Sequence, residues 1–347
     1  MPRSISQRPL IKVFSLLLFI LAILWAASFF PELVLTVIFS SLLAFVLRPL
    51  VRALEFQFGM RRVLAIAVVF IVIGGFLVTT ALKIAPIVIA QVEVMYHRFQ
   101  QFPFDQKLRE LAESVSASVP MLNAREIAAR INGLLSQLQS SLGDVFGNAV
   151  SYAAMLVIVP FITYFILAEG DAAMKKLIER VPNKYFEMTL NVMDKIRRDL
   201  ISYLRGWILE SIIVGVLTIV GLFILGIDYP ILIGTLAGVA NLVPYLGPVV
   251  GASLAGIISL MQFGGFQKLG AIIVMTLIIR VIDDTIIQPL CFAKSIDMHP
   301  VFVILILILG HELMGVGGML IAIPIATILK VSATGTYWGL KNYRITG

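Results

Sequence analysis

The sequence of 347 residues is 59% hydrophobic and 14% charged, and its mean hydropathy is +0.99. Soluble globular proteins contain about 45–50% apolar and about 25% charged residues, so this composition excludes an ordinary soluble enzyme and indicates a polytopic membrane protein. The net charge is +7, but the basic residues lie mostly beside apolar runs, which favours a role in membrane orientation over nucleic-acid binding. The single cysteine cannot form a disulfide within the chain, and with three histidines it gives no basis for a structural zinc site.

Three apolar runs occupy the N-terminal part of the chain, over residues 13–30, 33–47 and 63–82. A helix of about 20 apolar residues crosses the hydrocarbon core, so each run predicts a membrane span. Pro31 and Glu32 separate the first two spans, which predicts a tight helical hairpin. Basic residues precede the hairpin and follow it: Arg3, Arg8, Lys12, Arg48, Arg52, Arg61 and Arg62. Both flanks of the hairpin, the N-terminus included, are therefore predicted in the cytoplasm.

Two polar segments lie in the middle of the chain. The first, residues 83–147, lacks a basic bias and has apolar residues at helical spacing, so it predicts amphipathic helices outside the membrane. These helices either pack on each other and on the membrane surface or form a lid over a translocation path. Residues 149–167 then predict a span back to the cytoplasm, and the basic segment 169–205 predicts two cytoplasmic helices divided at Pro182.

The C-terminal part contains apolar stretches with breaks. Residues 207–225 predict a span that begins with an interfacial Trp207. Residues 231–263 contain no charged residue but are interrupted at 241–248, and residues 301–329 are interrupted at 310–318. Broken helices at membrane depth occur where they are buried in protein or line a wet cavity, so two breaks predict a translocation site. We therefore divide the chain into residues 1–82, 83–147, 148–206 and 207–347, the last being the transport bundle.

The first candidate site is the break from Asn241 to Pro248. Pro244 and Pro248 donate no backbone hydrogen bond, and Gly247 accepts backbone conformations that other residues avoid. Backbone carbonyls freed near Asn241 would coordinate a cation or a hydroxyl-rich solute. The alternative is a re-entrant turn with a purely structural role.

The second candidate site combines Arg280, Asp283, Asp284, Gln288 and Pro289. Residues three and four apart share a helix face, so both carboxylates can reach the guanidinium. Charges in hydrocarbon are costly and therefore face the bundle interior or water. The group predicts either a polar lining of the substrate path, with a proton or cation relay, or an ion pair that anchors a helix end.

Two weaker candidates complete the set. His311 and Glu312 lie between two apolar half-helices and precede a glycine-rich segment. A histidine is a plausible proton acceptor, but a solvated turn at a membrane face explains the pair equally well. Glu210, three residues after Trp207, is explained as well by an interfacial position. We predict no catalytic residue, metal or cofactor, because the sequence lacks a Walker A motif, H-E-x-x-H and G-x-S-x-G.

Several motifs of the C-terminal half resemble those of one transporter family. They are Asn241-Leu-Val-Pro244 with Gly247-Pro248, Asp284-Thr-Ile-Ile-Gln-Pro289, Asp297-Met-His-Pro300, and a glycine-rich last span ending Ile323-Pro324 and Leu329-Lys330. With the chain length and the polar insertion, this pattern is similar to that of the AI-2E transporters, which include autoinducer-2 exporters and PerM-like permeases. Carried over by motif, the family positions are Asn241, Pro244, Gly247, Pro248, Asp284, Pro289, Pro300, Gly315, Gly318 and Pro324.

The resemblance implies an all-α membrane protein with about eight spans, located in the bacterial inner membrane as a homo-oligomer. Together with the residues it predicts an exporter of a small polar solute, with autoinducer-2 as the family's type substrate. A first alternative is a Na⁺(Li⁺)/H⁺ antiporter that uses Asp283, Asp284 and Glu312. A second is a membrane scaffold whose polar segments recruit partners.

Overall fold

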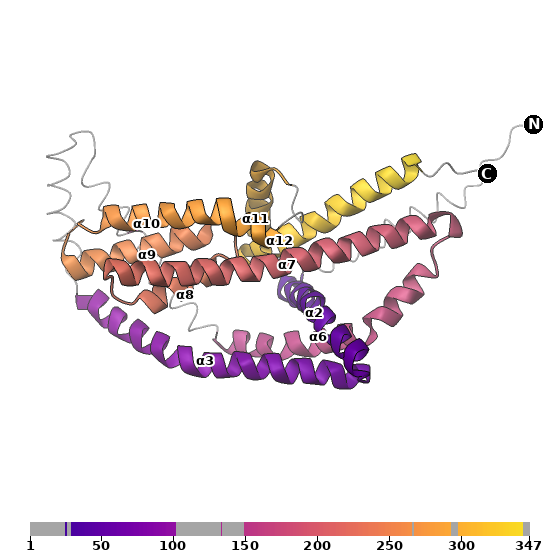
Figure 1. Ribbon diagram of the computed structural model, residues 1–347, viewed down its shortest axis with the longest axis horizontal. Coiled ribbons are helices and arrows are strands. Elements are labelled where there is room, and N and C mark those ends of the chain that lie inside the picture. The colour runs from indigo at the N-terminus through magenta and orange to yellow at the C-terminus, as the bar shows by residue number, and fades with distance from the viewer. Residues whose placement is uncertain are drawn as a thin grey trace, which may run out of the picture.

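A computed structural model describes residues 25, 29–101, 133, 149–265, 267–292 and 298–342. All secondary-structure elements among these residues are helices (Figure 1). Six of the described helices are long and apolar enough to cross a membrane, and α8 is a shorter apolar helix. The prediction of an all-α polytopic membrane protein is therefore confirmed. The predicted first span and most of the predicted external insertion lie outside the described residues.

The first two described helices are longer than the apolar runs that predicted them. Helix α2, Pro31–Phe58, begins with proline in its first turn and ends before Gly59, whose φ of 63° is left-handed. The predicted basic loop is thus partly helical, because α2 continues through Arg48 and Arg52. Helix α3, Arg62–Gln101, contains 40 residues. At 1.5 Å per residue it is about 60 Å long and extends beyond a hydrocarbon core of about 30 Å.

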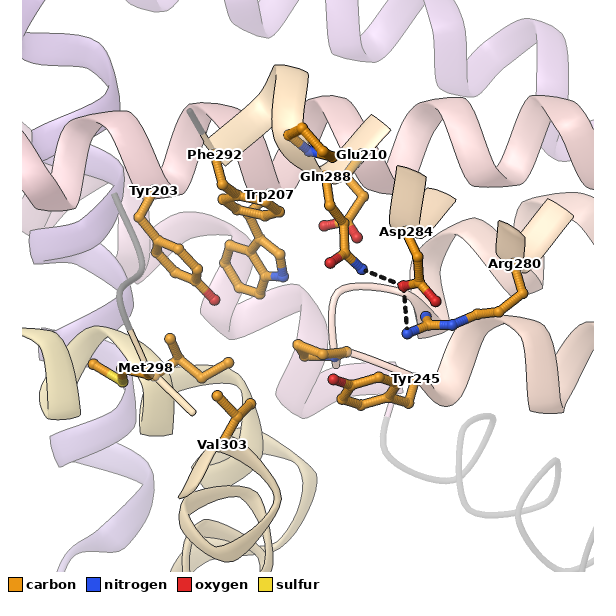
Figure 2. Close-up of a pocket in the computed structure, with 13 residues that line it drawn as sticks. Tyr203, Trp207, Glu210, Tyr245, Arg280, Asp284, Gln288, Phe292, Met298 and Val303 are labelled. Atoms are coloured by element: carbon orange, nitrogen blue, oxygen red, sulfur yellow. Dashed lines mark hydrogen bonds and ion pairs between the residues drawn. The ribbon is translucent and has the colours of Figure 1, made fainter. Parts of the chain in front are cut away.

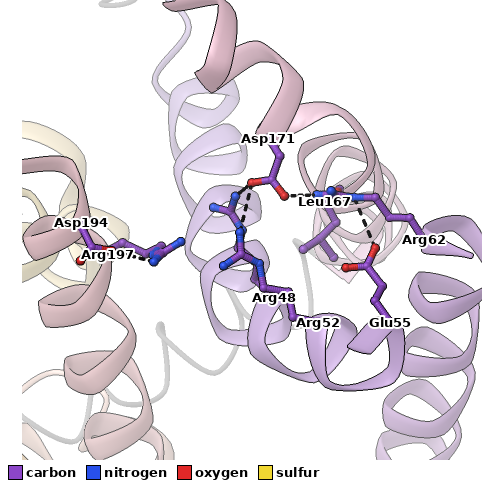
Figure 3. A network of polar contacts seen from close by, with 8 residues as sticks. All are labelled: Arg48, Arg52, Glu55, Arg62, Leu167, Asp171, Asp194 and Arg197. Atoms are coloured by element: carbon purple, nitrogen blue, oxygen red, sulfur yellow. Dashed lines mark hydrogen bonds and ion pairs between the residues drawn. The ribbon is translucent and has the colours of Figure 1, made fainter. Parts of the chain in front are cut away.

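An ion cluster joins the ends of α2, α3 and α6 (Figure 3). Helix α6 is Ala149–Ile178 and supplies Asp171. This carboxylate pairs with three arginines of α2 and α3, which are Arg48, Arg52 and Arg62. Arg62 also donates from Nε to the Leu167 carbonyl at 2.8 Å. The cluster fixes the α2–α3 turn against α6 and places these three helix ends on one side of the bundle.

The predicted break at 241–248 is a re-entrant hairpin packed on α7. Helix α7, Asn183–Leu225, crosses the whole molecule in Figure 1. Helix α8, Pro230–Ala240, folds back along it, and α9, Leu246–Phe263, returns to the starting side. Two contacts fix the hairpin: Gln262 donates to the Gly226 carbonyl at the open end, and the Trp207 indole donates to the Leu242 carbonyl at the tip. The tip therefore lies at the depth of Trp207.

Helix α10, Leu269–Ile282, continues through a π-helical turn, η1, Asp283–Ile287, into α11, Gln288–Phe292. This segment runs antiparallel to α7. A side chain at Gly221 of α7 would meet Met275 of α10, and one at Gly206 would meet the Cys291 carbonyl of α11. Small residues on α7 thus allow the close approach of both ends of the segment. Its middle, where η1 lies, faces the central part of α7.

Helix α12, Pro300–Asn342, is a second hairpin rather than a straight helix. Met314 has φ −146° and ψ 22°, and Gly315 has φ 61° and ψ −145°, so the helical path reverses there. The residues on either side, Gly310 and Gly318, meet backbone to backbone, with no room for a Cβ atom. The predicted break at 310–318 is therefore present, and it gives α12 two legs, residues 300–313 and 316–342.

Candidate functional site

A cavity of about 480 Å³ lies between α7, the tip of the α8–α9 hairpin, the α10–α11 segment and the two legs of α12 (Figure 2). Each of these elements contributes side chains to its wall. The lining residues are Tyr203, Trp207, Glu210, Pro244, Tyr245, Arg280, Asp284, Gln288, Pro289, Phe292, Met298, Val303 and Ile323. The cavity thus lies where the broken helices meet, which is the usual place of a solute site in transporters.

The structure brings together the two candidate sites that the sequence singled out. The guanidinium carbon of Arg280 lies 4.6 Å from the centroid of the Tyr245 ring, at the tip of the α8–α9 hairpin. Pro244 lines the cavity beside Tyr245, and Pro289 lines it from the α10–α11 segment. Tyr245 has a left-handed φ of 73°, a strained conformation for a residue with a side chain. The hairpin tip therefore holds this ring in a backbone conformation that directs it at Arg280.

The charges around Arg280 form a compact network. Its Nη2 pairs with Asp284 Oδ1 at 2.7 Å, and its Nη1 pairs with Asp283 Oδ2 at 3.3 Å. Gln288 donates to Asp284 Oδ1 at 3.2 Å and to Asp283 Oδ2 at 3.4 Å. Asp283 is 1% exposed, whereas the side chain of Asp284 is 48% exposed. Asp284, Gln288 and Arg280 line the cavity, and Asp283 lies behind them.

Glu210 is a candidate site residue that the sequence analysis ranked as weak. It comes from α7, is 8% exposed and lines the cavity. Its side chain lies beside Gln288 in Figure 2, and its carboxyl group interacts electrostatically with Asp283. The sequence signal was a single acid inside an apolar span, which an interfacial position explained equally well. Its proximity to η1 depends on the packing of α7 against α10, and the sequence does not show this.

Aromatic side chains complete the wall next to Glu210. The rings of Tyr203 and Trp207, four residues apart on α7, are nearly parallel, with centroids 5.8 Å apart and planes at 18°. Phe292 of α11 stacks on Tyr203 at 5.8 Å and 26°. The sequence analysis placed Trp207 at the membrane interface and did not include these rings in the site. The cavity therefore has an aromatic side and a charged side.

Other predicted site residues lie outside the cavity wall. Asn241 is 2% exposed, and the Gly247 backbone packs against its side chain, so it supports the hairpin tip from behind. Gly247 and Pro248 belong to the first turn of α9. His311 and Glu312 are exposed near the reversal of α12 and do not line the cavity. Among the described residues, no group of three or more His, Cys, Asp or Glu side chains is arranged to hold a metal ion.

The sequence matches one family model over residues 14–338, described as AI-2E family transporter. The chain belongs to the AI-2E transporter family. It is 27% identical over 314 residues to "Putative transport protein YueF" of Bacillus subtilis, covering 87% of this chain and 82% of that protein. It is 27% identical over 329 residues to "Putative permease PerM" of Escherichia coli K12, covering 92% of each chain. The AI-2E membership identifies a multi-pass membrane transporter, and the expected family resemblance is confirmed.

Proposed function

We propose that this AI-2E family protein exports a small polar solute and that the cavity between the two hairpins is its solute site. The observation that carries the proposal is the convergence of both broken helices on one cavity lined by Arg280, Asp284, Gln288 and Glu210. Small-molecule sites are mostly apolar clefts of about 300–1,000 Å³ with a few converging polar groups, and this cavity fits that description. Autoinducer-2, the family's type substrate, is one candidate because it needs hydrogen-bonding partners. Export is the direction that the resemblance to autoinducer-2 exporters implies.

Filling the cavity tests this proposal. Val303 of α12 is half-buried and points into the cavity (Figure 2), so Val303→Phe should occupy space that a solute needs. Val301, two residues away on the same leg, is 57% exposed, and Val301→Phe is the matched control. In proteoliposomes supplied with a panel of small polar solutes, wild type and Val301→Phe should support flux of at least one solute. Val303→Phe should lower that flux about ten-fold or more. Equal flux through both variants would contradict the proposed site.

One observation favours a second function, Na⁺(Li⁺)/H⁺ antiport. Three carboxyl groups lie at or behind the cavity wall: Asp283 and Asp284 pair with Arg280, and Glu210 lines the cavity from α7. Glu312, which the sequence suggested as a third antiporter carboxylate, is exposed and outside this group. Addition of Na⁺ or Li⁺ to proteoliposomes should then change the internal pH, and Asp283→Asn should abolish the change. A scaffold without transport activity would show neither this response nor cavity-dependent flux.

We further propose the bacterial inner membrane as the location, both termini in the cytoplasm, and assembly into a homo-oligomer. The basic residues at one side of the bundle support the orientation, since the Arg48, Arg52 and Arg62 cluster lies at that side. The broken helices support assembly, because their backbone needs protein or water at membrane depth. Mass measurement in nanodiscs and in several mild detergents tests the assembly. A monomer under all of these conditions would contradict it.

A further inference from the structure

Among the described residues, the charges that line the cavity do not balance. Arg280 is the one basic lining residue of this part of the chain, whereas Glu210 and Asp284 line the cavity and Asp283 lies directly behind them. Arg280 is already paired with Asp283 and Asp284 and stacked over Tyr245. Among the described residues, no basic side chain lies within salt-bridge distance of the Glu210 carboxyl group. Within the described residues the cavity therefore has an excess of acidic groups, and Glu210 is the lining acid that forms no salt bridge there.

An excess of buried carboxylates is costly unless a positive charge or a proton compensates it. Here Trp207, on the aromatic side of the cavity, lies three residues before Glu210 on α7, and both line the cavity. In Figure 2 the rings of Trp207 and Phe292 stand between Tyr203 and Glu210, whereas Arg280 lies on the far side of Gln288 and Asp284. Aromatic faces attract cations through the ring quadrupole, and aromatic side chains around a site are a known way to bind quaternary ammonium groups.

We infer that the cavity binds a small organic cation, an ammonium group with apolar substituents that rests against Trp207 and Phe292 with its charge at Glu210. The inference rests on the proposed solute site and names the class of solute. The cavity volume of about 480 Å³ favours a molecule over a bare metal ion. An anionic solute would meet the acidic excess, and Arg280 is not free to bind it. An uncharged polyol would form hydrogen bonds with Gln288 but would leave the charge uncompensated.

The contribution of charge is measured with two probes of the same shape. In 3,3-dimethyl-1-butanol a carbon atom replaces the positively charged quaternary nitrogen of choline, so the two molecules have the same shape and differ in charge. Isothermal titration with the full chain in nanodiscs should show choline binding at least ten-fold tighter than the alcohol. Glu210→Gln keeps the size of the side chain and removes its charge, so it should lower choline affinity about ten-fold and leave the affinity for the alcohol unchanged. Glu187→Gln, an exposed position on the same helix α7, is the control and should behave as wild type.

A second variant addresses the aromatic side and does not depend on the folding of Glu210→Gln. Phe292→Leu keeps an apolar side chain but removes the ring, and should weaken choline binding several-fold more than binding of the alcohol. Similar affinity of wild type for both probes, absence of choline binding, or a choline preference that survives both variants would each overturn the inference. The flux comparison of Val303→Phe with Val301→Phe does not depend on the charge of the solute. Cavity-dependent flux without a choline preference would therefore reject the cationic solute and keep the proposed solute site.

Discussion

Arg280 lies over the ring of Tyr245, with its guanidinium carbon 4.6 Å from the ring centroid, and this contact links the α10–α11 segment to the tip of the α8–α9 hairpin. The two residues are 35 positions apart in sequence. The same guanidinium pairs with Asp283 and Asp284, so one side chain connects the π-helical turn, the hairpin tip and the cavity. We therefore expect Arg280 to contribute more to the stability of this region than either carboxylate alone.

The first prediction compares the two sides of this ion-pair network. Arg280→Met leaves the fully buried Asp283 without its cation, and breaking a buried pair from one side costs about 3–5 kcal/mol. Asp284→Asn removes a half-exposed carboxylate and leaves Arg280 with Asp283 and Tyr245, so the expected cost is about 0–1 kcal/mol. Thermal unfolding midpoints in detergent measure the difference. A larger decrease of the unfolding midpoint with Asp284→Asn than with Arg280→Met would contradict this arrangement of the ion-pair network.

The second prediction concerns the reversal of α12. A Cβ atom at Gly318 would lie 2.8 Å from the Gly310 carbonyl carbon and 2.9 Å from Met314 Cβ, so Gly318→Ala forces the two legs apart. Overpacking of this kind costs about 1–3 kcal/mol. Gly74, inside α3, has no atom within 4 Å of its Cβ position, and Gly74→Ala should be neutral or stabilise by up to about 1 kcal/mol through helix propensity. Gly318→Ala should therefore lower the unfolding midpoint and Gly74→Ala should not, and a neutral Gly318→Ala would argue against the close hairpin.

The third prediction concerns Asp171, the shared partner of three arginines at the end of the bundle. Asp171→Asn removes the negative charge that holds the three arginines together, so their positive charges repel each other. Because these side chains are partly exposed, the expected loss of stability is about 1–2 kcal/mol. Asp194→Asn is the control, because Asp194 pairs within α7 with Arg197 and Arg198 and, among the described residues, forms no ion pair with another helix. We expect the control to shift the unfolding midpoint by a degree or less on the scale of about 2–4 °C per kcal/mol. Equal effects would show that the cluster does not hold the helices together.

The elements that the sequence predicted well are those set by local chemistry. Apolar runs predicted α2, α6 and the span in α7. A single segment inside the hydrocarbon core must satisfy its backbone hydrogen bonds internally, and an α-helix does so. The charge-free stretch with its two prolines predicted the break between α8 and α9, and the glycine-rich segment predicted a break at 310–318, although not that the helical path of α12 reverses there. In each case the residues themselves limit the backbone, so no knowledge of neighbouring helices was needed.

The features that the sequence did not predict depend on packing between distant segments. The extension of α3 from Lys83 to Gln101 was not predicted. The end of an apolar run marks where a helix leaves the membrane, and the helix itself continues beyond that point. The position of Glu210 opposite Asp283, 73 residues apart, depends on how α7 packs against α10. The same packing places Asp283 and Asn241 behind the cavity wall, although the sequence analysis named both as candidate site residues.

The last prediction concerns the sides of the membrane. Asn183 begins α7, whereas Gln267 lies in the turn after α9, next to the other end of α7, because Gln262 of α9 contacts the Gly226 carbonyl. Helix α7 has 43 residues, about 64 Å at 1.5 Å per residue, so these two exposed positions lie on opposite sides of a hydrocarbon core of about 30 Å. The arginines near the Asn183 side predict that this side is cytoplasmic. In a Cys291→Ser background, a membrane-impermeant maleimide added to intact cells should therefore label Gln267→Cys and leave Asn183→Cys unlabelled until the cells are lysed. Labelling of Asn183→Cys alone in intact cells would reverse the orientation, and labelling of both would show that one of them is not separated from the outside by the membrane.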